Sequence, residues 1–299
     1  MRCLLGILMI GALQAQTVNY TYDEAGRLIR VAYPNGKTIS YSYDPAGNLL
    51  RRLVFSAVAG AAPVAGAAGV VNAASFLGGP VAAGEIVTLF GAGIGPANLV
   101  GATLTRFGFV DTLAGETSVL FDGIPAPVIY SSTGQTSVIV PYAVAAKANT
   151  QMVVEYQGRR SAPVAIPVAA AVPALFWANS SVKGNGAILN EDTSFNSADN
   201  PAAKGSVVVL YGTGEGQTNP PGIDGRIAAA VFPKPLTPIT VRIGGIDAEV
   251  LYFGAAPGLV AGVFQVNARV PAEAPSGDVP VVVSVGSAAS QPELTVAVQ

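Results

Sequence analysis

An oxygen-rich stretch stands out among the residues that can do chemistry. Residues 190–200 (NEDTSFNSADN) hold three candidate calcium ligands, Asp192, Asn196 and Asp199. Calcium binds about six to eight oxygen atoms, which carboxylates and amide carbonyls supply. The spacing is not that of an EF-hand, and the glycine that bends such a loop is missing. The same residue types also form Asx turns that need no metal, so both interpretations stay open.

Aromatic side chains form a second candidate set, because their flat rings can stack on sugars or on a protein partner. The pairs Tyr20 and Tyr22, and Tyr41 and Tyr43, follow the period of two that places side chains on one face of a strand. This tyrosine face could bind a ligand or pack against a neighbouring domain. Trp177 could serve as a carbohydrate platform, although a single tryptophan beside a phenylalanine is also typical of core packing.

Catalytic chemistry is restricted by what the chain lacks. It contains no histidine, which excludes Ser-His-Asp and Cys-His catalysis and any histidine-ligated zinc site. Four carboxylates invite comparison with the paired acids of glycoside hydrolases: Asp122, Asp224, Asp247 and Glu249. Turn chemistry explains Asp122 and Asp247 equally well. We therefore expect no enzyme and no resident cofactor apart from the calcium alternative.

A glycine-rich loop follows a predicted strand at residues 91–95 (GAGIG), as it would in a dinucleotide-binding site. Pro96 comes next, and no amphipathic helix follows to present its N-terminus to a phosphate. Residues 212–216 (GTGEG) occupy the same place in a second copy of the pattern. A turn repeated in this way indicates architecture rather than nucleotide binding.

Composition narrows the location and the partners. The 299 residues carry 16 basic and 18 acidic side chains, with no basic block that could neutralise the phosphates of a nucleic acid. The N-terminus has Arg2, an apolar run over residues 4–13 and a plausible cleavage site after Ala15. These features predict a secretory signal peptide over residues 1–15, with an uncleaved anchor as the alternative. No later apolar run is long enough to predict a transmembrane helix.

Residues 17–55 form a distinct block with alternating strands and turn residues, which predicts a four-stranded antiparallel meander. Residues 20–28 (YTYDEAGRL) and 41–49 (YSYDPAGNL) share a long motif, 21 residues apart. The motif resembles the YD repeat of RHS-type surface and toxin proteins, in which many repeats build a large β shell. Two repeats cannot enclose anything, so the shell function does not carry over.

The low-complexity run that follows, residues 57–70 (AVAGAAPVAGAAGV), is uncharged and predicts a linker over 56–70. The rest of the chain contains an internal repeat. Residues 83–93 (AGEIVTLFGAG) align with 204–214 (KGSVVVLYGTG), and three later blocks align in the same order. Two copies of one domain, each with about seven short strands, predict immunoglobulin-like β-sandwiches over 71–170 and 171–299.

The order of these blocks resembles IPT/TIG domains. More narrowly, residues 70–299 resemble the C-terminal domain family abundant in Solibacter and related acidobacterial secreted proteins, on motifs such as 71–76 (VNAASF), 173–176 (PALF) and 211–216 (YGTGEG). The resemblance implies export and an extracytoplasmic role, and no activity.

The sequence thus predicts an all-β protein with two tandem immunoglobulin-like sandwiches and an N-terminal YD-repeat meander. We expect a secreted, non-catalytic structural or adhesive protein, whose partner is a cell-envelope component, a surface polysaccharide or another protein. Open sheet edges in the meander also permit self-association. A polysaccharide-binding module is the alternative, and a secreted hydrolase the third.

Overall fold

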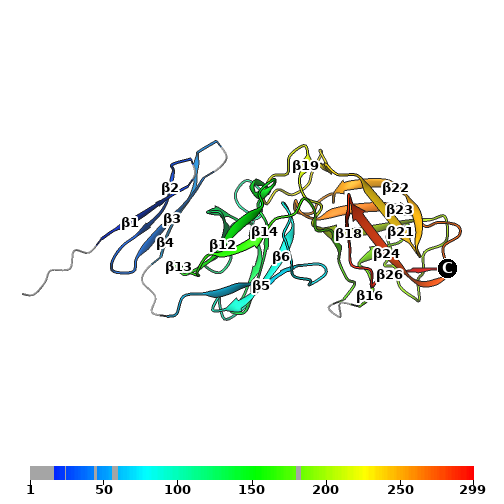
Figure 1. The fold of residues 1–299 in the computed structure, drawn as a ribbon, viewed down its shortest axis with the longest axis horizontal. Helices are drawn as coiled ribbons and strands as arrows, with labels where there is room; N and C mark the ends of the chain where they lie inside the picture. Colours follow the sequence, from blue (N-terminus) through cyan, green and yellow to red (C-terminus); the bar gives the residue numbers. More distant parts are fainter. Residues whose placement is uncertain (1–16, 24, 44–45, 56–59, 180–182) are drawn as a thin grey trace, which may run out of the picture. The chain divides into compact units, whose positions relative to one another are not determined.

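The computed structural model describes residues 17–299 except 24, 44–45, 56–59 and 180–182 (Figure 1). The predicted signal peptide, residues 1–15, lies outside the described residues. The chain divides into two compact units, one ending at Ala59 and one spanning Gly60–Gln299. The fold is all-β, as predicted, and the described residues include one short 3-10 helix, η1 (Tyr142–Val144).

The first unit is a four-stranded antiparallel meander in chain order, which confirms the prediction for the YD block. Its strands are β1 (Asn19–Tyr22), β2 (Leu28–Ala32), β3 (Thr38–Tyr43) and β4 (Leu49–Phe55). The register places Tyr20, Val31, Ile39 and Val54 opposite one another across all four strands. Bulges interrupt β1 between Thr21 and Tyr22 and β3 between Ser42 and Tyr43, at the same point of both repeats.

The second unit begins with a sandwich of two sheets. One sheet has the order β5 (Val64–Asn72), β6 (Ile86–Ala92), β11 (Gln135–Ile139), β10 (Val128–Ser131) and β7 (Val100–Gly101). The other has the order β13 (Arg159–Arg160), β12 (Asn149–Tyr156), β8 (Thr117–Phe121) and β9 (Ile124–Pro125), and β14 (Val164–Pro167) also pairs with β12. Their facing side chains form one core that includes Val87, Leu89, Phe121, Val138 and Met152.

The linker prediction is wrong over its second half, because β5 covers Val64–Asn72 and pairs with β6. The composition misleads because backbone hydrogen bonds need no side chain, and small residues let the two strands approach closely. A β-carbon at Gly69 would overlap the carbonyl oxygen of Phe90 on β6. The register shifts between Ala65 and Val70, and Val70 is buried in the first core.

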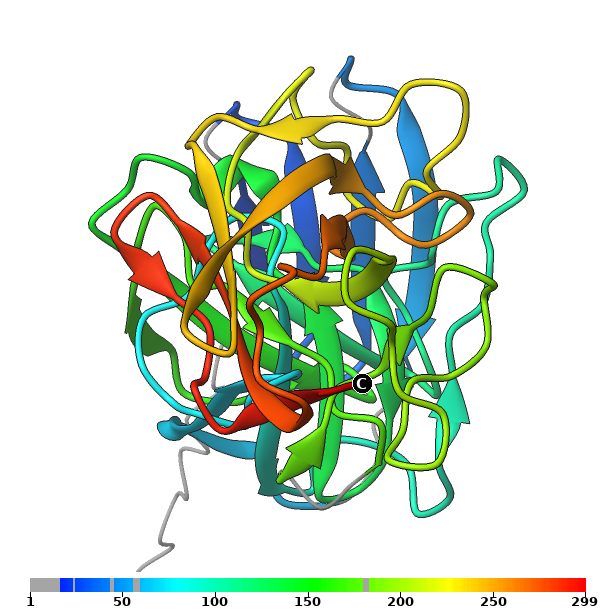
Figure 2. The same cartoon turned by 90° about the vertical axis from the view of Figure 1, so that its right-hand side faces the viewer.

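The second sandwich is a single ten-stranded sheet that folds over its own core. Its main order is β15 (Ala174–Leu175), β18 (Val207–Thr213), β23 (Phe264–Arg269), β22 (Ile246–Ala255), β21 (Ile239–Ile243), β24 (Gly277–Val285), β26 (Leu294–Val298) and β16 (Gly184–Asn185). Short strands β17 (Ile188–Leu189) and β25 (Ala288–Ala289) pair with β18 and β24. Figure 2 views this sandwich with β26, drawn in red, ending at the C-terminus.

The repeat predicted from sequence has a structural counterpart. Strand β6 pairs with β11 as β18 pairs with β23, and β12 pairs with β8 as β24 pairs with β21. Even a side-chain bond is repeated, since Ser161 Oγ accepts from Val154 N and Ser290 Oγ accepts from Val283 N, both at 3.0 Å. In the second copy, β22 is continuous where β9 and β10 of the first copy are separate.

The two sandwiches form one compact unit and are not separated by a free linker. The predicted boundary at 170/171 falls in a connector that hydrogen-bonds to both sides. Ala169 N donates to Val81 O of the first sandwich, and Val172 N donates to Gly214 O of the second. A third small apolar cluster contains residues of both sandwiches, with Ile86, Ile139, Ala256 and Val263 buried in it. A hairpin of β19 (Thr218–Asn219) and β20 (Lys234–Pro235) completes the second sandwich.

Candidate functional site

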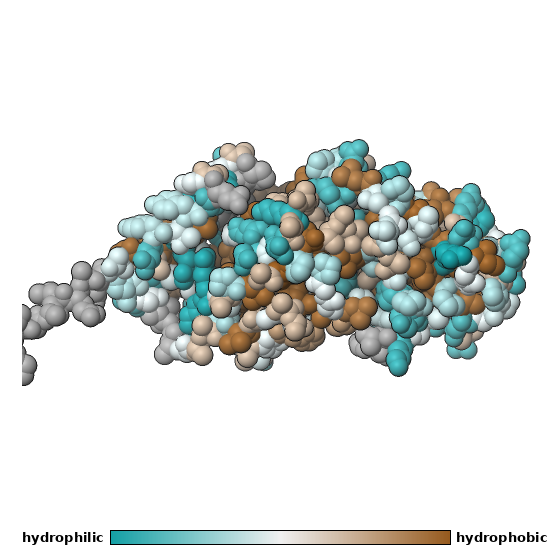
Figure 3. Space-filling view, viewed as in Figure 1, coloured by the Kyte–Doolittle hydropathy of each residue, from teal (hydrophilic) through white to brown (hydrophobic). Residues whose placement is uncertain are grey.

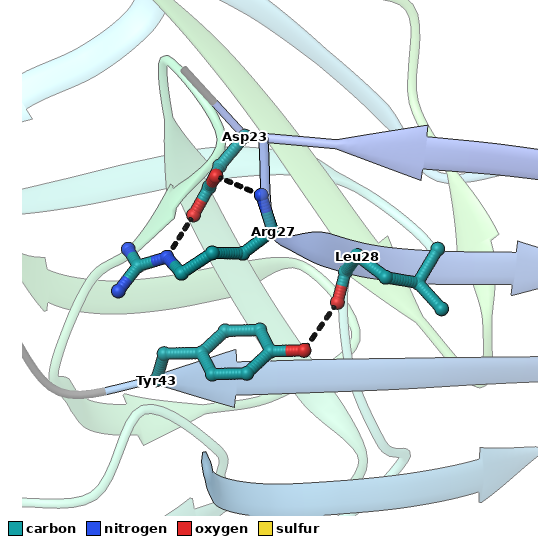
Figure 4. Close-up of polar contacts among 4 residues, drawn as sticks. All are labelled: Asp23, Arg27, Leu28 and Tyr43. Atoms are coloured by element: carbon teal, nitrogen blue, oxygen red, sulfur yellow. Dashed lines mark hydrogen bonds and ion pairs between the residues drawn. The ribbon is translucent and has the colours of Figure 1, made fainter. Parts of the chain in front are cut away.

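The YD motif builds the turn between β1 and β2 (Figure 4). Asp23 accepts hydrogen bonds from the backbone N of Arg27 at 2.8 Å and from its guanidinium Nε at 2.7 Å. Burial opposes ionisation of Asp23, but the hydrogen bonds and the positive charge of Arg27 outweigh it and lower the pKa of this carboxyl. The motif residues Asp23 and Arg27 therefore fix the turn and are not free for a ligand.

Tyr43 belongs to the same frame. Its hydroxyl donates to the carbonyl oxygen of Leu28 at 2.8 Å, and the guanidinium carbon of Arg27 lies 5.1 Å from the centre of its ring. Figure 4 shows the ring lying beside the Asp23–Arg27 pair. The bulge before Tyr43 interrupts the period of two that predicted a shared face with Tyr41. Tyr43 is thus a structural residue of the repeat.

Tyr20 and Tyr22 keep the properties expected of a binding surface. They lie on the outer strand β1 and are 58% and 57% exposed. Tyr41 lies on the inner strand β3, opposite Arg52, and is half-buried. The four predicted tyrosines therefore divide into two exposed on the edge strand and two used within the sheet.

The oxygen-rich loop is tied together by its own side chains. Asp192 Oδ1 accepts from the backbone N and the hydroxyl of Ser194, and these hydrogen bonds lower the pKa of Asp192. Asn196 is buried, and its amide bonds to Asn190 and to both the N and the O of Ala297 on β26. Calcium would bind Asn196 through Oδ1, which already accepts the hydrogen bond from Ala297 N. Asp199 lies exposed, and no group of three or more acidic, histidine or cysteine residues forms a metal site within the described ranges.

Trp177 packs against the core of the second sandwich and is partly buried. Its indole nitrogen is buried and has no hydrogen-bond partner in the part of the chain that the structure describes. This placement agrees with the core-packing interpretation. The exposed aromatic surface among the predicted ligand-binding residues is therefore that of Tyr20 and Tyr22.

The four carboxylates that invited comparison with glycosidases each have a separate partner. Lys147 and Thr150 donate to Asp122 Oδ2 at 3.0 and 2.9 Å. Surface ion pairs join Asp247 to Arg242 at 3.0 Å and Glu249 to Arg269 at 2.8 Å. Asp224 lies elsewhere, at the junction between the sandwiches, where its Oδ1 accepts from the backbone N of Tyr142 at 2.9 Å.

This junction contains several buried polar groups. Thr213 Oγ1, at the end of β18, accepts from Ile86 N at 2.8 Å and donates to Gly262 O at 2.6 Å. The ring of Tyr142 occupies the space that β-carbons at Gly84 of the first sandwich and Gly222 of the second would need. The Ile86–Thr213 hydrogen bond and the contact of Tyr142 with Gly222 join the two sandwiches.

Two buried glutamates lie at the centre of the junction. Glu85 precedes β6 and is 1% exposed, and its carboxylate accepts from Asn72 Nδ2 at 2.8 Å and Ala82 N at 2.7 Å. Glu215 follows β18 and is 4% exposed, and its Oε2 has no hydrogen-bond partner among the described residues. The pKa of each glutamate is raised to about 8, mainly by burial, and the charge of Glu215 contributes to the increase at Glu85.

Sequence reasoning missed this junction. Glu85 and Glu215 belong to the aligned strand motifs, where they drew attention only as parts of a repeat. One signal was available in the sequence. Each glutamate is an isolated acid beside a predicted strand: Glu85 follows Gly84 and precedes an apolar run, and Glu215 lies between Gly214 and Gly216. Buried positions of that kind rarely hold a carboxylate without a specific reason.

Comparison with family models matches residues 22–54 to the RHS Repeat family. The match covers the YD block and confirms that part of the predicted resemblance. No curated protein matches the chain. The narrower resemblance of residues 70–299 to the Solibacter-type family stays a prediction.

Solved structures offer only remote likeness. The Plexin A4 extracellular region matches 86% of this chain and 18% of its own at 13% identity and a TM-score of 0.26. The Bacteroides ovatus mixed-linkage glucan utilization protein SGBP-B, solved with a heptasaccharide, matches 95% of this chain and 60% of its own. The identity is 13% and the TM-score 0.31. Surface layer protein SbsC, domains 4–9, matches 93% of this chain and 44% of its own, at 14% identity and a TM-score of 0.24. The chain spans less than two thirds of each, and such scores carry no functional argument.

Proposed function

We propose that this chain is a non-catalytic extracytoplasmic interaction protein that binds its partner through the YD block. The observation that carries the proposal is the outer strand β1, which presents Tyr20 and Tyr22 to solvent and pairs on one side only among the described residues. An unpaired strand edge can receive a strand from another chain, with main-chain hydrogen bonds providing affinity.

The double sandwich supports a structural role. Its carboxylates form surface pairs, brace turns or lie buried at the junction, and none converges with another on an open cleft in the contacts described above. On the face shown in Figure 3, apolar and polar residues are interspersed over both sandwiches. No helix in the described residues is long and apolar enough to cross a membrane. Secretion by the predicted signal peptide and attachment to the cell surface belong to this proposal.

Polysaccharide binding is the second candidate, favoured by the two exposed tyrosine rings on one strand. Both candidates use the same strand but different atoms. Strand addition uses the backbone of β1, whereas sugar stacking uses the rings. Substitution of Tyr20 and Tyr22 by alanine should therefore abolish sugar binding and only weaken strand addition.

The test is co-sedimentation of the purified chain with cell envelopes and with a panel of insoluble polysaccharides, followed by hydrogen exchange of the bound protein. New protection of β1 amides supports strand addition, and loss of binding in Y20A/Y22A without such protection supports sugar stacking. Tyr33→Ala, which removes an exposed tyrosine from the loop after β2, is the matched control. The proposal is contradicted if saturable binding is unchanged in Y20A/Y22A and the β1 amides gain no protection. Release of soluble sugars by the pure protein would also contradict it.

A further inference from the structure

We propose that the junction between the two sandwiches is a proton-dependent latch, closed when Glu85 and Glu215 are protonated and loosened when they ionise. The latch lies within the second compact unit and is independent of the partner-binding role proposed for the YD block. Its components come from both sandwiches, so a change in their charge acts on the association of the sandwiches and not on either core.

The hydrogen-bond pattern of Glu215 favours a neutral carboxyl group. Its Oε2 is buried without a partner among the described residues, and its other support comes from its own backbone. An ionised carboxylate needs several donors, and burying one without them costs far more than burying a neutral acid. Glu85 has two donors, yet it lies within the field of Glu215.

The charged groups that act on this pair and on the neighbouring Tyr142 are acidic. Burial raises the pKa of the Tyr142 hydroxyl on η1, and the charges of Glu215 and of Asp224, in the loop after β19, add to the increase. Asn72 at the end of β5 and Thr213 at the end of β18 are neutral. The charges that shift the pKa values of Glu85 and Tyr142 are acidic, so each lost proton adds to the repulsion.

The latch opens more easily than either sandwich unfolds, because the apolar cluster at the junction is much smaller than the two cores. Its buried residues are Ile86, Ile139, Ala256 and Val263, whereas each sandwich core contains many more buried residues. Opening would bring water to both carboxylates, which removes the cost of ionising them. Because the pKa of both glutamates lies near 8, the transition falls between neutral and mildly alkaline pH.

Hydrogen exchange on the full chain tests the latch, with rates corrected for the intrinsic effect of pH. Ile86 N and Val110 N bond across the junction, to Thr213 Oγ1 and Gly225 O. Between pH 6 and pH 9, these two amides should lose at least about tenfold protection, a change of about 1.4 kcal/mol. Amides of β12 and β23 inside the sandwiches should keep theirs.

Glu85→Gln and Glu215→Gln mimic the neutral acid; each should remove part of the selective loss at pH 9, and E85Q/E215Q should remove most of it. Glu273→Gln, an exposed glutamate in the turn after β23, should behave as the unaltered chain. A second measurement needs no substitution. When the chain is labelled at the glutamate carboxyl carbons and titrated by NMR, two glutamate resonances should titrate near pH 8. Uniform loss of protection, unchanged junction amides, or glutamates that all titrate near their usual pKa would overturn the latch.

Discussion

Glu85 and Glu215 lie at opposite ends of equivalent strands, since Glu85 precedes β6 of the first sandwich and Glu215 follows β18 of the second. The aligned positions in the other copy hold Ser206 and Ile94. Each copy therefore supplies one acid that its counterpart lacks. The pair exists because the sandwiches stack so that the start of β6 meets the end of β18, as the bond from Ile86 N to Thr213 Oγ1 shows.

This arrangement predicts that the free energy of unfolding decreases as the pH rises from about 4.5 to about 8. The native chain keeps protons on Glu85 and Glu215 in this window, whereas the unfolded chain releases them. Raising the pH therefore favours the unfolded state, by up to about 1.4 kcal/mol per pH unit for each proton. Below the unfolded pKa of 4.5, their stabilising contribution is fully present.

Urea unfolding at pH 5, 7 and 9 measures this dependence. The lowered pKa values of Asp23, Asp122 and Asp192 act in a different window and cost stability only as the pH falls below about 4. The raised pKa of Asp224 acts in the same direction as those of the two glutamates, so its share of the decrease remains in the E85Q/E215Q double variant. E85Q/E215Q should flatten the profile above pH 5, and Glu273→Gln should not. A profile that rises steadily from pH 5 to pH 9 would contradict the assignment.

Sequence patterns predicted what depends on local periodicity. Alternation and turn residues were enough for the YD meander, and the aligned blocks were enough for two copies of one sandwich. Patterns failed where an outcome depends on contacts between distant segments. Asn196 shows this, because its amide bonds to Ala297 on β26, a strand about a hundred residues away in the chain. A calcium-binding loop and a loop held in place by a buried asparagine amide have the same local composition, so the sequence does not distinguish them.

Asp224 gives a prediction about the contact between the sandwiches. Burial raises the pKa of its carboxyl, and its Oδ1 accepts the backbone N–H of Tyr142 at 2.9 Å. Asp224→Ala leaves that N–H without its acceptor, which should cost about 1–3 kcal/mol of stability. Asp224→Asn keeps an acceptor and removes the charge, so its cost should stay below about 1 kcal/mol. Denaturant unfolding at pH 7 compares them, and equal losses would exclude a role for the hydrogen bond.

Gly214 and Gly205 flank β18 and offer a matched comparison. Both have positive φ, +89° and +84°. A β-carbon at Gly214 would overlap the carbonyl oxygen of Val172 in the connector, whereas one at Gly205 would meet nothing. Gly205→Ala should cost about 1 kcal/mol for backbone strain alone. Gly214→Ala should cost at least about 2 kcal/mol more, because strand and connector must separate. Equal thermal stability of the two variants would refute this account of the repeated glycine turn.

The sequence could not show how the YD motif uses its own residues. Tyr22 and Tyr43 occupy equivalent places in the two repeats, yet Tyr22 is exposed on the edge and Tyr43 donates to Leu28 O on the neighbouring strand. The difference comes from position in the sheet. Tyr43 lies on the inner strand β3 and can bond to the neighbouring strand β2, whereas Tyr22 lies on the edge strand β1. Repeat identity alone gives no such distinction.

That difference leads to a prediction about the turn after β1. Asp23 holds both the backbone N and the guanidinium of Arg27, and Arg27 in turn lies over the ring of Tyr43. Asp23→Ala removes the first link and should free Arg27 from the ring, so amides of β1 and β2 should exchange at least about fivefold faster. Asp23→Asn keeps the bond to Arg27 N but loses the ion pair, and should have an intermediate effect. Tyr43→Phe keeps the ring and removes only the bond to Leu28 O, so its effect should be confined to β2 and β3. If D23A leaves exchange in β1 and β2 unchanged, the YD motif does not stabilise the sheet through this turn, and its role must be sought at the exposed edge strand β1 instead.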